Sequence, residues 1–303
     1  MYRPPSAQPA ISSLPAAPLR SPLFPPLHAV FQPIVRLHDD SILGYEALIR
    51  GPRGSPLAQP DALFRHAREI GATVALECEA ARVALAAWHA LALPGKLFLN
   101  FSALTLRSLL CGAAEGMVEV LTVAGEPVAP ERIVIELTEQ TATGDIDSFA
   151  RAMEMLTERG VQFALDDFGT GHANLDLLVA LSPQFVKIDK SLVRGIESCA
   201  RRREILRAML RMMRAIGGTV IAEGIEDGGA LAAVRKLGVI AAQGYFLGRP
   251  DATGGTRTLL AANQADINCS TWRAMTCDGS RGATGTTGVT TSSARALSST
   301  SSR

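Results

Sequence analysis

Apolar segments of two kinds alternate along the middle of the chain. Short runs rich in Val, Ile, Leu and Phe are typical of buried strands, and longer segments with apolar residues three or four apart are typical of amphipathic helices. Strands are expected at Val30–Val35, Ile42–Ile49, Lys96–Phe101, Ile133–Leu137, Gln162–Asp166, Phe185–Ile188, Thr219–Ala222 and Ala242–Leu247. Helices are expected at Asp61–Leu91, Leu104–Val123, Ile146–Arg159, Ala173–Leu181, Arg201–Ile216 and Ala230–Leu237.

This alternation predicts an α/β fold, a modified TIM (β/α)8 barrel. Strands that alternate with helices form a parallel sheet covered by the helices, and such a barrel fits in about 250 residues. The first two strands are joined only by a short polar stretch around LHDDS, which is too short for a parallel crossover. We therefore expect one antiparallel strand in an otherwise parallel barrel.

The two ends of the chain differ in composition from its middle. Residues 1–26 carry many prolines, and residues 264–303 drift into Ser, Thr, Gly and Ala. Segments of this kind bury too little surface to offset the entropy lost on ordering. We expect a flexible leader over 1–26, one folded domain over 27–263 and a disordered tail over 264–303.

Charge and cysteine content narrow the class of protein. The formal net charge is +1, which gives no electrostatic basis for binding a long nucleic acid. The five cysteines are odd in number and show no C-x-x-C spacing, as expected of reduced thiols. Neither an apolar run of membrane-spanning length nor a signal peptide pattern is present in the sequence. We expect a soluble cytoplasmic protein that does not enter a membrane.

Polar residues stand near the carboxyl end of nearly every predicted strand, where barrels of this type place their active sites. One acidic strand end is also typical of a solvated turn, but many that converge on one rim favour a site. These residues are Glu46, Asn100, Glu136, Glu139, Asp166, Asp167, Lys187, Asp189, Glu223, Glu226 and Gln243.

The residue types in this set indicate metal-assisted chemistry. Carboxylate and amide oxygens without His or Cys partners suit Mg²⁺ or Mn²⁺ rather than zinc. The adjacent Asp166 and Asp167 reach one metal site only if the backbone turns at the strand end. So many carboxylates would repel a phosphodiester unless metal ions neutralised them, and two ions can clamp a phosphoryl group during displacement.

Two basic residues near the same rim have two interpretations each. Lys187 either orients water and stabilises charge on a phosphate, or is a salt-bridge partner of the acids. Arg50 either recognises phosphate or guanine as a fork donor, or pairs with an acid at the rim.

The motifs FQPI, YEALIR, LNFS, IELTE, LDDFGTG, VKID, AEGIE and QGYFLGRP, in this order, resemble the EAL domain of cyclic di-GMP phosphodiesterases. The resemblance covers about Phe31 to Pro250 and implies hydrolysis of cyclic di-GMP to linear pGpG with Mg²⁺ or Mn²⁺ and inhibition by Ca²⁺. It also implies a homodimer. No GGDEF-like segment is present in the sequence, so we expect a stand-alone EAL protein whose regulatory input is unknown.

The resemblance also implies roles for individual residues. It implies that Lys187 and Glu223 act on the hydrolytic water and that Glu139 anchors the loop after the paired aspartates. It implies metal ligands at Glu46, Asn100, Glu136, Asp166, Asp167 and Glu223. Of these, Glu46 and Glu223 are also expected to be catalytic. It implies substrate contacts at Gln32, Leu48, Arg50, Asp189, Gln243 and Pro250.

Two features leave alternatives open. His172 stands in DDFGTGHANL at a position where many active members have an aromatic residue. This departure leaves open a catalytically silent EAL module that binds cyclic di-GMP or a protein. A different Mg²⁺-dependent barrel enzyme, or one that uses Lys187 as a Schiff base, is the more distant alternative. The helix expected at Arg201–Ile216 is either an ordinary amphipathic barrel helix or a contact surface for a regulator.

Overall fold

A computed structural model describes residues 23–110, 115–123, 125–138, 146–169 and 175–255. The expected disordered tail and all but the last four residues of the expected leader lie outside these ranges, as do Glu139 and His172. Within the described ranges, no helix has the length and apolar character needed to cross a membrane.

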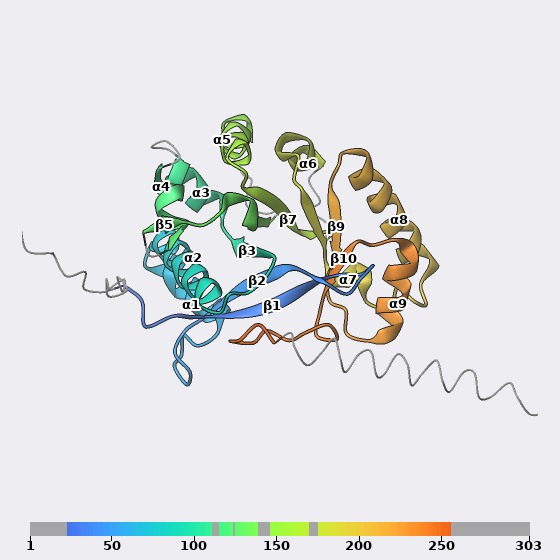
Figure 1. The fold of residues 1–303 in the computed structure, drawn as a ribbon, viewed down its shortest axis with the longest axis horizontal. Coiled ribbons are helices and arrows are strands. Elements are labelled where there is room, and N and C mark those ends of the chain that lie inside the picture. Colours follow the sequence, from blue (N-terminus) through green and yellow to red (C-terminus); the bar gives the residue numbers. More distant parts are fainter. Residues whose placement is uncertain (1–22, 111–114, 124, 139–145, 170–174, 256–303) are drawn as a thin grey trace, which may run out of the picture. The chain divides into compact units, whose positions relative to one another are not determined.

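Eight strands close into a barrel in the order β1-β10-β9-β8-β7-β6-β3-β2 (Figure 1). β1 pairs antiparallel with both β2 and β10, and every other neighbouring pair in the ring is parallel. This confirms the expected barrel with one antiparallel strand. The strands are β1 (His28–Arg36), β2 (Ile42–Arg50), β3 (Lys96–Asn100), β6 (Ile133–Thr138), β7 (Gln162–Phe168), β8 (Phe185–Ile188), β9 (Thr219–Ala222) and β10 (Ala241–Gln243).

Helices lie outside the ring of strands (Figure 1). A 3-10 turn at Pro130–Arg132 precedes β6, and a small separate sheet pairs β4 (Thr122–Val123) with β5 (Glu126–Pro127). The helices are α1 (Pro60–Glu69), α2 (Thr73–Ala90), α3 (Ala103–Leu110), α4 (Glu115–Val120), α5 (Ile146–Glu158), α6 (Leu175–Leu181), α7 (Lys190–Val193), α8 (Ala200–Ala215) and α9 (Gly228–Leu237).

Two apolar layers stabilise the barrel. The larger one lies between the strands and the helices and includes Tyr45, Trp88 and Phe163. The smaller one is formed by one residue from each of the eight strands, and two of its members, Phe98 and Phe185, pack edge to face with ring centroids 5.5 Å apart. Successive strand residues point to opposite faces, so the strands carry both layers at once. The small layer comprises Ile34, Leu43, Phe98, Val134, Ala164, Phe185, Ile221 and Ala241.

Three of the expected elements are wrong in extent. The helix expected over Asp61–Leu91 is two helices, because Gly71 adopts φ +68° between α1 and α2. The segment expected as one helix over Leu104–Val123 contains α3 and α4 and ends in β4, and residues 111–114 of it are not described.

The last strand ends at Gln243 instead of continuing to Leu247. The backbone turns at Gly244, whose carbonyl accepts hydrogen bonds from the N–H groups of Leu247 and Gly248. A Cβ at Gly244 would lie 2.2 Å from the nitrogen of Ile225, so the turn requires glycine. Gln243 is therefore the terminal strand residue.

Candidate active site

A polar layer follows the small apolar layer on the strands. Phe98 is followed two residues later by Asn100, and Val134 is followed by Glu136, so both members of each pair point to the same face. In β1, which runs the opposite way, the polar residue precedes the apolar one. The whole layer consists of Gln32, Glu46, Asn100, Glu136, Asp166, Lys187, Glu223 and Gln243.

Lys187 lies at the centre of this layer and is only 1% exposed. Its Nζ lies 2.8 Å from Glu223 Oε1 and 3.0 Å from Glu136 Oε1. It also lies 3.3 Å from both Glu46 Oε2 and Asp166 Oδ1. One buried ammonium therefore pairs with four carboxylates that come from β2, β6, β7 and the residue after β9.

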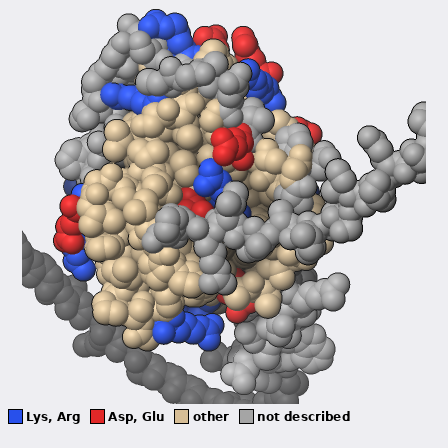
Figure 2. Space-filling view, turned by 90° about the vertical axis from the view of Figure 1, so that its left-hand side faces the viewer, with Lys and Arg blue, Asp and Glu red and all other residues tan. Residues whose placement is uncertain are grey.

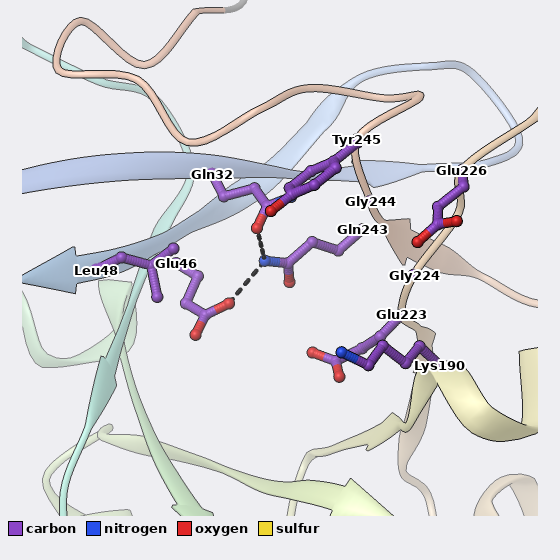
Figure 3. Close-up of a pocket in the computed structure, with 10 residues that line it drawn as sticks. All are labelled: Gln32, Glu46, Leu48, Lys190, Glu223, Gly224, Glu226, Gln243, Gly244 and Tyr245. Carbon is purple, nitrogen blue, oxygen red and sulfur yellow. Dashed lines mark hydrogen bonds between the residues drawn. The ribbon is translucent and has the colours of Figure 1, made fainter. Parts of the chain in front are cut away.

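A chain of amide hydrogen bonds orients Glu46. Asn100 Nδ2 donates to Glu46 Oε1 at 3.2 Å, and Gln243 Nε2 donates to Glu46 Oε2 at 2.6 Å. The same Gln243 nitrogen donates to Gln32 Oε1 at 3.0 Å, and Gln32 Nε2 donates to the carbonyl of Gly248 at 3.1 Å. Figure 3 shows the Gln243 amide between Gln32 and Glu46. Both carboxylate oxygens of Glu46 are thus held in place by neutral donors and by Lys187.

Burial and charge set the pKa values of this cluster in opposite directions. Burial lowers the pKa of Lys187, but the surrounding carboxylates outweigh it and raise that pKa well above its usual value. Burial raises the pKa of Glu136 well above its usual value and that of Glu223 to about 7. Burial also raises the pKa of Glu46, but Lys187 and the hydrogen-bond donors Gln243 and Asn100 outweigh burial, so the pKa of Glu46 is lowered.

Several buried oxygens of the cluster lack a hydrogen-bond partner among the described residues. Neither carboxylate oxygen of Glu136 receives a hydrogen bond, although Oε1 is ion-paired with Lys187. Asp166 Oδ1 likewise receives no hydrogen bond but is ion-paired with Lys187. Gln243 Oε1 also has no hydrogen-bond donor. Buried oxygens without donors are costly unless something else binds them, and a divalent cation is a suitable partner.

Asp166, Asp167 and Glu223 form a group that suits such a cation. One carboxylate oxygen from each lies within 4.8 Å of the others. Consecutive carboxylates can share this position because Asp167 adopts φ +56° and the pairing of β7 with β8 shifts register between Leu165 and Phe168. Aspartate tolerates the left-handed region better than most residues do. The donor set is entirely oxygen, which fits Mg²⁺ or Mn²⁺.

A pocket of about 260 Å³ opens beside the cluster. The acidic and amide residues Glu46, Glu223, Gln32 and Gln243 line it, together with Leu48. On the face drawn in Figure 2, acidic and basic side chains lie together near the centre among uncharged residues.

The other expected substrate contacts, Arg50, Asp189 and Pro250, are not among the residues that line the pocket. Arg50 donates from Nη1 to the carbonyl of Ile49 at 2.9 Å. The Asp189 carboxylate accepts a hydrogen bond from the Ser191 N–H at 2.8 Å and caps α7. Pro250 precedes Asp251, which exchanges two backbone hydrogen bonds with Phe31 of β1. Glu139 is not described, so its expected role as loop anchor has no structural account.

Four lining residues of the pocket are not predicted from the sequence: Lys190, Gly224, Gly244 and Tyr245. Glu226 is predicted at the rim without an individual role, and Tyr245 belongs to the QGYFLGRP motif. Lys190 directly follows VKID, and only its position in space distinguishes it from an ordinary surface lysine.

The model of the EAL domain family matches residues 26–250. The chain belongs to the EAL family. Among curated relatives, the cyclic di-GMP phosphodiesterase NbdA of Pseudomonas aeruginosa is 31% identical over 240 residues, which cover 78% of this chain and 30% of that protein. The matched region likewise spans about a third or less of other curated relatives, at 32, 27 and 17% of their lengths.

Solved EAL structures share the fold. A standalone EAL protein of Vibrio cholerae O395 in its cyclic di-GMP-bound form superposes with a TM-score of 0.67 at 28% identity, covering 75% of this chain and 92% of that one. The manganese and cyclic di-GMP complex of Klebsiella pneumoniae BlrP1 has a TM-score of 0.68 at 29% identity, covering 80% of this chain and 61% of that one. This EAL chain thus has neighbours of its own fold that bind cyclic di-GMP, in one case with manganese.

Proposed function

We propose that this EAL domain hydrolyses cyclic di-GMP to linear pGpG in a reaction that depends on Mg²⁺ or Mn²⁺. The observation that carries the proposal is the convergence of five carboxylates, three amides and one buried lysine beside a pocket. A crowd of acids would repel a phosphodiester, so the arrangement has a use for such a substrate only with bound cations.

We propose two kinds of metal-holding residue. Glu136, Asp166, Asp167 and Glu223 have buried oxygens without protein donors or carboxylates that lie close together. Glu46 and Asn100 are added because the family resemblance implies them. Glu46, Asn100, Glu136 and Asp166 would hold one ion, and Asp166, Asp167 and Glu223 would hold a second. When bound, these ions supply Lewis acidity toward the phosphate oxygens and lower the pKa of coordinated water.

The remaining residues position the substrate and the attacking water. Lys187 keeps its proton because four carboxylates surround it, so it donates to water or phosphate and does not act as a base. Its distance of 2.8 Å to Glu223 fixes that carboxylate at the pocket wall, where an attacking water would lie. Gln243 and Gln32 keep the Glu46 carboxylate in one orientation.

The same charge state argues against Lys187 as a Schiff-base nucleophile. A lysine forms an imine only as the neutral amine, which requires a lowered pKa. The pKa of Lys187 is raised. A catalytically silent EAL module remains the main alternative, and it differs from the enzyme in binding cyclic di-GMP without forming product.

We also propose the wider context of the domain from its resemblance and composition. The folded domain extends over 27–263 and acts as a homodimer in the cytoplasm. Size-exclusion chromatography with light scattering tests the dimer. Limited proteolysis tests the domain boundaries.

The deciding experiment compares the wild-type chain with Glu46→Ala and a matched control, Glu69→Ala. Glu69 is an exposed carboxylate on α1 outside the pocket. Each protein is incubated with cyclic di-GMP and Mn²⁺, and nucleotides are resolved by chromatography. We expect pGpG from the wild type and the control, and none from Glu46→Ala or after chelation.

The other outcomes separate the alternatives. Binding of cyclic di-GMP by the wild type without pGpG would establish the silent module. Product that survives chelation would disprove the proposed metal dependence even if the enzyme were active.

A further inference from the structure

Lys190 is an exposed lysine that lines the pocket beside the acidic cluster. It is the first residue of α7 and the one basic residue among the ten that line this pocket. Figure 3 shows its side chain on the side of the pocket formed by Glu223 and Gly224, opposite Leu48. Its ammonium is therefore placed where a bound ligand would meet it.

Lys190 helps to lower the pKa of the neighbouring Asp189 carboxyl, but no direct contact within the described part of the chain holds its ammonium. Among the described residues, its ammonium forms neither a hydrogen bond nor an ion pair with another side chain. Two acidic residues that line the pocket with Lys190 pair with other cations: Glu223 with Lys187 at 2.8 Å and Glu226 with Arg194 at 3.3 Å. A positive charge thus remains available at the pocket wall.

The stem of Lys190 is held by the backbone of the loop after β9. Gly224 adopts φ +67°, and a Cβ built on it would lie 2.3 Å from the Cβ of Lys190 and 3.2 Å from its Cα. The missing side chain at position 224 is what lets the two segments approach so closely. The capped start of α7, where Asp189 accepts from Ser191, holds the other side of the lysine. The base of the side chain is therefore fixed and only its end is free to move.

The substrate presents a charge that matches this position. Cyclic di-GMP contains two phosphodiester groups, each with one negative charge, and the proposed metal ligands would serve the one that reacts. Lys190 is the one cation among the lining residues that can face the other phosphate, because the rest of the lining consists of carboxylates and neutral groups. Arg50 is not among the residues that line this pocket.

We propose that Lys190 binds the non-reacting phosphate of the cyclic dinucleotide and so sets substrate affinity. The inference rests on the proposed function for the identity of the ligand. A lysine acts on a phosphate as a point charge and does not need the fixed fork geometry of arginine. Because the contact exists before and during the reaction, its loss should weaken binding much more than it slows chemistry.

The test compares Lys190→Ala, Lys190→Arg and the control Lys236→Ala with the wild type. Lys236 is an exposed lysine on α9 that does not line the pocket, so its loss changes the net charge equally. We expect Lys190→Ala to raise KM about tenfold with kcat within about twofold of wild type, as for loss of one partly screened charged contact. Lys190→Arg should restore most of the affinity, and Lys236→Ala should leave KM unchanged.

Salt dependence gives a readout that a purely structural role would not affect. The wild-type KM should rise with NaCl concentration more steeply than that of Lys190→Ala, because one screened attraction has been removed. Equal KM values and equal salt slopes in an active wild type would overturn the role of Lys190 and leave the proposed function intact.

Binding measurements keep the inference testable if the wild type proves inactive. Calorimetry with cyclic di-GMP in Ca²⁺ would then have to show about tenfold weaker binding by Lys190→Ala. Equal dissociation constants, or no binding by the wild type, would overturn the inference.

Discussion

Glu77 of α2 is a buried carboxylate outside the pocket that supports a proposed metal ligand. It is 5% exposed, and its Oε2 accepts hydrogen bonds from the N–H and the hydroxyl of Ser102, at 2.8 and 3.0 Å. The Ser102 hydroxyl also contacts Thr105 Oγ1 at 3.2 Å. Ser102 lies two residues after Asn100, so Glu77 fixes the backbone that presents the Asn100 amide to Glu46.

The variant Glu77→Ala should therefore weaken both the fold and metal binding. The partly buried N–H of Ser102 would lose its acceptor, and the Ser102 hydroxyl would keep only Thr105, so the free energy of unfolding should fall by about 1–3 kcal/mol. Glu77→Gln keeps an acceptor oxygen and should recover most of that loss. Urea denaturation gives the stability, and calorimetric titration with Mn²⁺ gives the affinity.

Glu79→Ala is the matched control on the same helix. The Glu79 side chain is 14% exposed, and its contact with Arg82 is a long one at 3.9 Å, so its loss should cost about 1 kcal/mol or less. If Glu77→Ala unfolded at the wild-type urea concentration and bound Mn²⁺ as tightly, Glu77 would have no supporting role.

At the scale of elements, the close contact of β2 with β3 depends on Gly44. A Cβ at this position would lie 2.4 Å from the carbonyl oxygen of Lys96 and 3.0 Å from Phe98 Cε2. The first contact is with backbone, which cannot rotate away, so the strands would have to move apart. Gly44 lies two residues before Glu46 and on the same face.

Gly44→Ala should consequently lower the free energy of unfolding by about 1–3 kcal/mol, as overpacking in a core does. The shift of β2 should also reduce the rate of cyclic di-GMP hydrolysis. Gly228→Ala is the control, because its Cβ would meet nothing closer than 3.6 Å, at Phe246, and alanine favours a helix. Equal urea midpoints for Gly44→Ala and the wild type would show that the barrel accommodates the extra atom.

All eight barrel strands could be predicted because each is a short apolar run, and these runs alternate with helical segments along the sequence. The antiparallel β1 could be predicted because a short connection cannot form a crossover. The break between α1 and α2 could not, because apolar spacing continues across it and one glycine dihedral angle decides it. The short α7 and the β4–β5 pair contain too few residues to show any period.

At the scale of the whole molecule, site residues differ in how far sequence can predict them. Glu136 and Lys187 lie on regular strands, so strand direction and a two-residue period predict that they converge. Lys190 could not be predicted to line the pocket, since its position depends on a close approach to Gly224, 34 positions later in the chain. Contacts between loops of this kind leave no pattern in the residues themselves.

Charge at this scale leads to the last prediction. The chain has 30 basic and 29 acidic residues, yet the site gathers five carboxylates, of which four pair with Lys187. Metal ions that bind only the folded state should stabilise the whole domain by mass action. At a free Mn²⁺ concentration about 100-fold above Kd, the stabilisation is about 2.7 kcal/mol, or a rise in Tm of roughly 5–10 °C for a domain of this size.

Thermal unfolding with and without Mn²⁺ checks this, with Asp166→Asn as the comparison. Asp166 is the residue proposed to serve both ions, and Asn is nearly equal in size but carries no charge. In chelator, the variant should be as stable as the wild type or more stable, because one of several crowded carboxylates is gone. Its Tm should rise much less with Mn²⁺. An equal rise in both proteins would mean that Mn²⁺ stabilises the domain from a different site, and the proposed ligand set would be wrong.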